Sequence, residues 1–84
     1  MTDDLHVLMH QLYLYQRQEV VDHLLRGNDT VCFTTEQYVA AWDRIVCKGR
    51  SVMYGGLARR HLTTYRKLRE VRPDVWAEAD VRPA

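Results

Sequence analysis

Proline, glycine and cysteine are all scarce in this chain of 84 residues, which has two prolines, four glycines and two cysteines. The first proline is Pro73, so none interrupts a helix in the earlier part of the chain. Cys32 and Cys47 are too few for a disulfide-stapled scaffold. Two free thiols are the favoured interpretation, and one bridge between them stays an alternative.

Long apolar runs are missing too, and no stretch approaches the length that a membrane-spanning helix needs. Asp3 and Asp4 make the first residues acidic where a secretory signal would be basic. We therefore expect a soluble, cytoplasmic protein with no membrane partner. Arginines outnumber lysines by ten to two, a bias that is typical of GC-rich bacterial and phage genomes.

The spacings of known catalytic and metal-binding motifs are also absent. His6 and His10 have the i, i+4 spacing of metal ligands, but neither an intervening glutamate nor a nearby third ligand completes a zinc site. Gly55-Gly56 lacks the preceding strand and the following lysine of a phosphate-binding loop. His61 falls on an apolar helix face, which favours a hydrogen-bonded core histidine over a catalytic base. The sequence therefore predicts no catalytic residue, metal or cofactor, and a protein that is not an enzyme.

The charge that is present is unevenly distributed, although the net charge is only +1. Residues 1–43 contain two arginines and seven acidic residues, whereas residues 44–72 contain nine basic residues and a single acid, Glu70. A domain with one acidic and one basic half is suited to electrostatic binding, and also to head-to-tail self-association.

The stretch from Thr2 to Gly27 predicts one long helix that is apolar on two opposite sides, taking about 100° of rotation per residue. One side holds Leu5, Leu8, Met9, Leu12, Tyr15 and Val20. The other side holds Val7, Leu14, Val21 and Leu25. Residues 16–19 are polar, which predicts a bend or a solvent-exposed turn there. A surface helix needs only one apolar stripe, so we expect this helix to be enclosed in a bundle or shared between chains.

A second helix is predicted over residues 35–48. Thr34 and Gln37 fit a capping box at its start, and Gly49 follows its end. The segment before it, Val31-Cys32-Phe33, is β-prone but too short and isolated to form a sheet, so we interpret it as a connector.

A third helix is predicted over residues 52–71. Its end is placed before Pro73, because the residue that precedes a proline disfavours the helical conformation. Residues 74–79 predict a short helical turn. With the first helix over residues 3–26, the predicted fold is all-α: a single domain of residues 1–84 built as a small three-helix bundle.

Basic residues gather in the second half of this predicted bundle. They form the predicted partner-binding face: Arg44, Lys48, Arg50, Arg59, Arg60, Arg66 and Lys67. Guanidinium groups pair with phosphate and carboxylate alike. A tight DNA-reading helix-turn-helix does not fit, because Lys48 and Arg50 flank Gly49 where that motif needs apolar residues. A looser contact with nucleic acid and a merely solvated face stay alternatives.

These observations predict a non-catalytic regulator, adaptor or inhibitor that binds another macromolecule. We favour a protein partner with an acidic surface, because the net charge is near zero and the DNA-reading motif fails. The alternative is a nucleic-acid-binding regulator that uses the arginine-rich face of the third helix. We assign self-association to one side of the first helix, which would meet its twin in a homodimer: Val7, Leu14, Val21 and Leu25.

Overall fold

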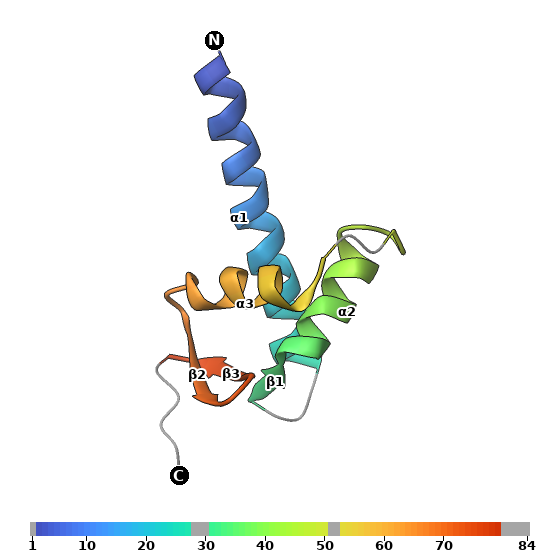
Figure 1. The fold of residues 1–84 in the computed structure, drawn as a ribbon, viewed down its shortest axis with the longest axis vertical. Coiled ribbons are helices and arrows are strands. Elements are labelled where there is room, and N and C mark those ends of the chain that lie inside the picture. Colours follow the sequence, from blue (N-terminus) through green and yellow to red (C-terminus); the bar gives the residue numbers. More distant parts are fainter. Residues whose placement is uncertain (1, 28–30, 51–52, 80–84) are drawn as a thin grey trace.

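The molecule consists of one long helix and a small body (Figure 1). The computed structural model describes residues 2–27, 31–50 and 53–79. In chain order these form α1 (Thr2–Gly27), β1 (Cys32–Thr34), α2 (Thr35–Ile45), α3 (Gly55–Thr63), β2 (Leu68–Arg72) and β3 (Val75–Glu78). α1 covers the predicted first helix, and its N-terminal half projects beyond the body.

The fold is mixed α/β, so the predicted all-α three-helix bundle is wrong. Three strands form one antiparallel sheet in the order β1-β3-β2. Phe33 of β1 pairs with Trp76 of β3, and Trp76 also pairs with Glu70 of β2. The sheet joins segments that are far apart in the sequence, and periodicity within a short window does not reveal such a pairing.

Residues 68–78 form a β-hairpin where the sequence predicts the end of a helix and a helical turn over 74–79. The hairpin turn is Pro73-Asp74, and Asp74 adopts a φ of 60°. Proline followed by a residue with positive φ suits a tight turn, and aspartate tolerates this conformation better than most side chains. The strand register shifts between Glu70 and Arg72. Pro73 is therefore part of a hairpin turn and does not mark the end of a helix.

α3 ends at Thr63, so the predicted third helix over 52–71 is too long. The hydroxyl of Thr64 donates to the carbonyl oxygen of Arg60 at 2.8 Å and closes the helix. Neighbouring threonines are weak helix formers because β-branching restricts their rotamers. Tyr65 and Leu68 are both buried beyond the end of α3, and their spacing imitates a helical periodicity.

β1 corrects the interpretation of Val31-Cys32-Phe33 as a connector, because residues 32–34 pair with β3. The start of α2 reinforces this pairing. The backbone N–H of Thr35 donates to the carbonyl oxygen of Asp74 at 3.0 Å, and the indole N–H of Trp76 donates to Thr35 Oγ1 at 2.9 Å. A three-residue strand is stable here because the hairpin supplies a partner and the following helix is bonded to the same turn.

The predicted capping box at the start of α2 is confirmed. The backbone N–H of Gln37 donates to Thr34 Oγ1 at 3.1 Å, and the backbone N–H of Thr34 donates to Gln37 Oε1 at 2.8 Å. α2 ends at Ile45 and is shorter than the predicted range of 35–48. Lys48 and Gly49 then adopt left-handed backbone conformations, with φ of 55° and 88°.

The variant Thr34→Ala is expected to lower the free energy of unfolding by about 1 kcal/mol, because the Gln37 N–H loses its acceptor. Denaturant unfolding followed by circular dichroism measures the difference. Thr34→Ser keeps the hydroxyl and is the matched control, with an expected loss below about 0.5 kcal/mol. Equal stability of the alanine and serine variants would show that this cap does not stabilise α2.

The core lies where the C-terminal half of α1 meets α2, α3 and the sheet. Its buried apolar side chains are Val20, Val21, Leu24, Phe33, Tyr38, Ala41, Trp42, Met53, Ala58, Leu62, Tyr65, Leu68 and Trp76. Tyr13 is the first residue of α1 that packs against them. The part of α1 before Tyr13 therefore has no such support from the described residues.

Candidate functional site

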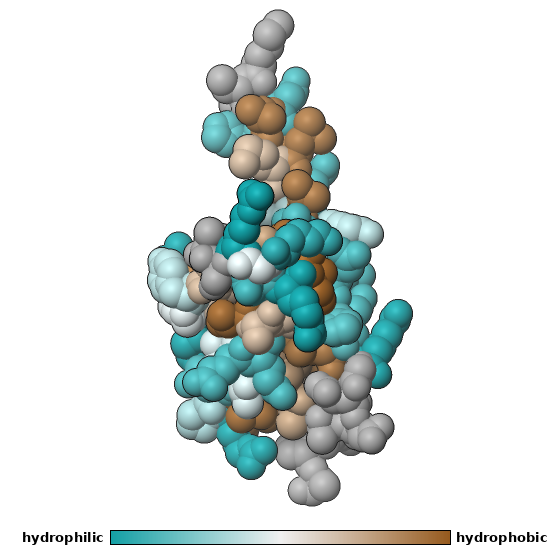
Figure 2. Space-filling model, turned by 90° about the vertical axis from the view of Figure 1, so that its right-hand side faces the viewer, coloured by the Kyte–Doolittle hydropathy of each residue, from teal (hydrophilic) through white to brown (hydrophobic). Residues whose placement is uncertain are grey.

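The projecting half of α1 is the most apolar exposed surface of the described chain. Every residue from 4 to 12 is exposed, and the large apolar ones are Leu5, Val7, Leu8, Met9 and Leu12. Figure 2 shows brown, apolar side chains gathered on this projecting part, above a body whose visible surface is mostly teal. A contiguous exposed apolar surface marks an interaction site in most soluble proteins.

One continuous line of side chains accounts for most of this surface, and we call it the α1 stripe. Its members are Leu5, Leu8, Met9, Leu12 and Tyr15. Spacings of three and four residues place them along one side of the helix. Their exposed fractions lie between 55% and 63%. Such values are high for five neighbouring large apolar residues, because each would be favoured in a buried environment.

The same side of α1 becomes polar after Tyr15. It continues with Gln16, Glu19, His23 and Arg26, of which the last three are exposed. His23 Nε2 lies 3.3 Å from Arg44 Nη2 at the end of α2. The α1 stripe therefore ends within the first turn that packs against the body, and four of its five residues lie before Tyr13, on the part of the helix that projects.

The predicted self-association residues divide between two environments. Val7 is exposed and Leu14 is half-buried, whereas Val21 is only 2% exposed and belongs to the core of its own chain. Leu25 is half-buried against the same core. The burial of Val21 and Leu25 therefore requires no companion chain. Most of the exposed apolar surface lies on the other side of α1, which periodicity alone did not distinguish from a core-facing side.

Arg17 fixes α1 to the body. It is buried, and its Nη1 donates to Tyr13 Oη, the His61 carbonyl oxygen and Thr64 Oγ1, each at 3.2 Å. Its guanidinium carbon lies 4.4 Å from the centre of the Tyr65 ring. The carbonyl of His61 is in the last turn of α3, where the helix dipole favours a cation. Arg17 thus caps α3 from α1 and holds the angle at which α1 leaves the body.

His61 occupies the aromatic part of the core. Its Nδ1 lies 3.0 Å from Tyr38 Oη, and its ring meets Tyr13 and Trp42 edge-on. Burial, together with the nearby Arg17 cation, lowers the pKa of His61 to about 4, and burial raises the pKa of Tyr38. A neutral imidazole with its proton on Nε2 accepts a hydrogen bond at Nδ1 from the Tyr38 hydroxyl. This environment confirms the interpretation of His61 as a core histidine.

Acidification is expected to destabilise the protein through His61. Its folded-state pKa of about 4 lies below the ordinary value of 6.5, so the unfolded chain binds the proton more readily. The contribution of neutral His61 to the free energy of unfolding is complete above pH 6.5 and is lost as the pH falls towards 4. Between pH 7 and 5 this loss lowers the free energy of unfolding by at most about 2 kcal/mol. Glu70 and Asp74 have lowered pKa values, so their titration lies below this window.

Urea unfolding at a series of pH values measures this dependence, with His61→Gln as the comparison. Glutamine at position 61 keeps a hydrogen-bond acceptor for Tyr38 but does not titrate. The variant should be less stable than the wild type at pH 7 and show a flatter pH profile. An identical pH profile in the two proteins would exclude His61 as the source.

The predicted basic face is not gathered on one surface. Arg44 is in the last turn of α2, and Lys48 and Arg50 lie in the loop after it. Arg66 and Lys67 follow the opposite end of α3, at the other side of the body (Figure 1). These two groups are exposed but separated by the length of α3.

The two remaining predicted residues, Arg59 and Arg60, are neighbours on α3 with different surroundings. Arg59 pairs with the carboxylates of Glu70, at 2.9 Å, and of Asp74, and lies over the ring of Trp76. Hydrogen bonding to these carboxylates raises the pKa of Arg59 and lowers the pKa of both acids. Arg59 therefore ties α3 to the hairpin, whereas Arg60 is exposed.

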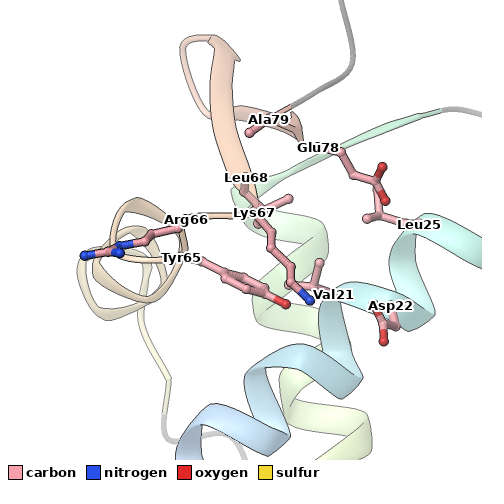
Figure 3. A pocket seen from close by; sticks show the side chains of 9 residues that line it. All are labelled: Val21, Asp22, Leu25, Tyr65, Arg66, Lys67, Leu68, Glu78 and Ala79. Carbon is pink, nitrogen blue, oxygen red and sulfur yellow. The ribbon is translucent and has the colours of Figure 1, made fainter.

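A pocket of about 550 Å³ opens between α1 and the turn from α3 to β2 (Figure 3). Val21, Leu25 and Leu68 supply part of its apolar lining. In Figure 3 the amine of Lys67 reaches across the pocket towards α1, where Asp22 lies. The remaining charged residues of the lining are Arg66 and Glu78. The volume suits a small molecule, but charges of both signs at the rim select no ligand class.

Three kinds of site are not found among the described residues. No three of their histidine, cysteine and acidic side chains are grouped in a way that could hold a metal ion. Cys32 and Cys47 are half-buried, and no disulfide joins them. In the described ranges, no helix combines the length and the apolar character that crossing a membrane requires.

Comparison with known proteins assigns no family to this chain, since no family model, curated protein or solved structure matches it.

Proposed function

We propose that this protein is a non-catalytic binding protein that docks the α1 stripe onto another protein. The observation that carries the proposal is the exposure of five large apolar side chains on a helix that projects from the body. Apolar surface of this kind is typical of protein–protein interfaces, where anchoring side chains such as Tyr15 contribute most of the binding energy.

The energetics of α1 support the proposal. A helical segment of about a dozen residues without tertiary packing is only marginally stable in water. Burial of each leucine or methionine contributes about 2 kcal/mol, so a partner that covers the α1 stripe would both bind and hold the segment helical. The exposed apolar surface of the projecting half and its marginal helical stability thus both favour binding to a partner.

The chemistry around the stripe favours an apolar partner surface. Asp4 and Glu19 lie at its two ends, and uncharged Gln11 lies between. The described part of α1 carries no exposed arginine or lysine before Arg26, since Arg17 is buried in the body. An apolar groove or helix face therefore fits the stripe better than a strongly acidic surface or a phosphate backbone does.

Affinity capture from an extract of the organism that produces the protein tests the proposal. Three full-length baits are compared: the wild type, the stripe variant Leu8→Glu/Leu12→Glu, and the control His6→Glu/His10→Glu. The control adds the same charge to exposed positions on the opposite side of α1. Circular dichroism checks that all three are folded.

The expected result is that at least one captured protein, which can be the chain itself, is lost with the stripe variant and kept with the control. The stripe variant should fold, because neither Leu8 nor Leu12 belongs to the core. Captured proteins that are the same for all three baits would contradict the proposed function.

A further inference from the structure

We infer that the surface which covers the α1 stripe is a second copy of the same chain, in an antiparallel pair of α1 helices. The inference rests on the proposed function, because it names the partner of the same surface. The two copies are related by a two-fold axis that passes near residue 10. Each copy then presents the same residues to the other, so the pairing closes and does not extend into a fibre.

The area of the stripe fits such a pair. Five side chains that are each more than half exposed present on the order of 600 Å² of surface per chain. Complete coverage of both stripes would bury at most about 1,200 Å², which is the lower end of the range for specific interfaces. The stripe alone is therefore large enough for a reversible dimer and too small for an obligate one.

The order of side chains along the stripe is self-complementary in the antiparallel orientation. With the axis near residue 10, Leu8 of one copy lies against Leu12 of the other, and Leu5 lies against Tyr15. The aromatic ring next to the body thus covers the leucine at the tip of the opposite helix. Met9 lies close to the axis and contacts its own counterpart, and methionine adapts well to such a site.

The charges at the two ends of the stripe disfavour the parallel orientation. A parallel pair would place Asp4 beside Asp4 and Glu19 beside Glu19, so that like charges meet at both ends. In the antiparallel pair the acids are far from their counterparts, and Asp4 lies beside the uncharged Gln16 and Gln18. Repulsion between like charges in the parallel pair and apolar contacts in the antiparallel pair therefore both favour the antiparallel orientation.

The bodies do not obstruct this pairing. α1 packs against its own body through Arg17, Val21 and Leu24, which lie on a different side of the helix from the stripe. The stripe extends over about 15 Å of helix, from Leu5 to Tyr15. In the antiparallel pair the two bodies lie at opposite ends of this overlap.

Sedimentation velocity of the purified full chain, from about 1 to 100 µM, tests the inference. We expect a monomer–dimer equilibrium within this range. Leu8→Glu should raise the dimer dissociation constant at least about a hundredfold, because it places two charges in the apolar contact. His6→Glu is the matched control on the opposite side of α1 and should leave the dissociation constant within about threefold of the wild type.

A distance between spin labels distinguishes the two orientations. The label is placed at Arg26→Cys, in a chain with Cys32→Ala and Cys47→Ala. Residue 26 lies sixteen residues from the axis, so the antiparallel pair places the two labelled backbone positions about 48 Å apart along the helix axis. A parallel pair would place them roughly 10–20 Å apart.

A monomer at 100 µM, or a dimer that Leu8→Glu does not weaken, would overturn the inference. A short distance between the labels would overturn the antiparallel orientation that it states. If the pure protein is monomeric while capture from the extract still depends on the stripe, this inference fails and the proposed function stands. If capture is also independent of the stripe, both fail.

Discussion

Trp76→Ala is expected to lower the free energy of unfolding by about 4 kcal/mol, within the range for removing a buried tryptophan. Trp76 is 2% exposed and lies on β3, the central strand, where it pairs with Phe33 on one side and with Glu70 on the other. The variant leaves a cavity beneath both neighbouring strands. The stability of this variant therefore tests the packing of the sheet, which the sequence did not predict.

Trp76→Phe separates the packing of Trp76 from its hydrogen bond. The phenyl ring keeps most of the buried apolar volume, but Thr35 Oγ1 loses the indole N–H that donates to it at 2.9 Å. We expect a loss of about 1–2 kcal/mol by chemical denaturation. If Trp76→Ala costs less than about 1 kcal/mol, residue 76 cannot occupy the centre of a packed sheet.

Arg17→Ala is expected to cost about 3 kcal/mol, although residues 16–19 look like a solvent-exposed turn in the sequence. The variant removes the hydrogen bonds to Tyr13 Oη, the His61 carbonyl oxygen and Thr64 Oγ1, together with the contact with the Tyr65 ring. Hydrogen bonds from a buried charged group contribute more than neutral ones, and stacking of a cation on an aromatic ring adds to them.

Arg17→Lys and Gln18→Ala are the control variants for Arg17→Ala. Lysine keeps the positive charge but lacks the planar guanidinium group, so Arg17→Lys should recover only part of the lost stability. Gln18 is exposed in the same turn, and its replacement by alanine should change stability by less than about 0.5 kcal/mol. If Arg17→Ala and Gln18→Ala have equal effects on thermal unfolding, Arg17 does not anchor α1.

The sequence was informative where structure depends on local signals. The absence of proline before Pro73 and the long apolar periodicity predicted a first helix, and α1 spans Thr2–Gly27. Thr34 and Gln37 predicted the start of α2, because a capping box is formed within four residues. Both features can be predicted from neighbouring residues alone, without knowing which distant segments pack against them.

The sheet could not be predicted in the same way. β1 has three residues and becomes a strand only because β3 pairs with it. Pro73-Asp74 was a local signal for a hairpin, but the apolar spacing of Tyr65 and Leu68 imitated a continuing helix. Long-range pairing overrode the local pattern here, as it often does for short strands.

The two-sided character of α1 was visible in the sequence, but the roles of the two sides were not. Val21 and Val20 are both buried although they belong to different predicted sides, because the body wraps the C-terminal half of α1. Leu5 and Val7 are both exposed, because the N-terminal half projects. Position along the helix therefore determines burial as much as the side does, and a helical wheel does not contain this information.

Hydrogen exchange of the backbone amides of residues 5–15, measured at about 1 and 100 µM protein, tests most directly whether a second copy covers the α1 stripe. If a second copy covers the stripe, the amides of residues 5–15 exchange fast at the low concentration and are strongly protected at the high one. The amides of α2 should exchange equally slowly at both. Exchange in residues 5–15 that does not change with concentration would show that no second copy covers the stripe.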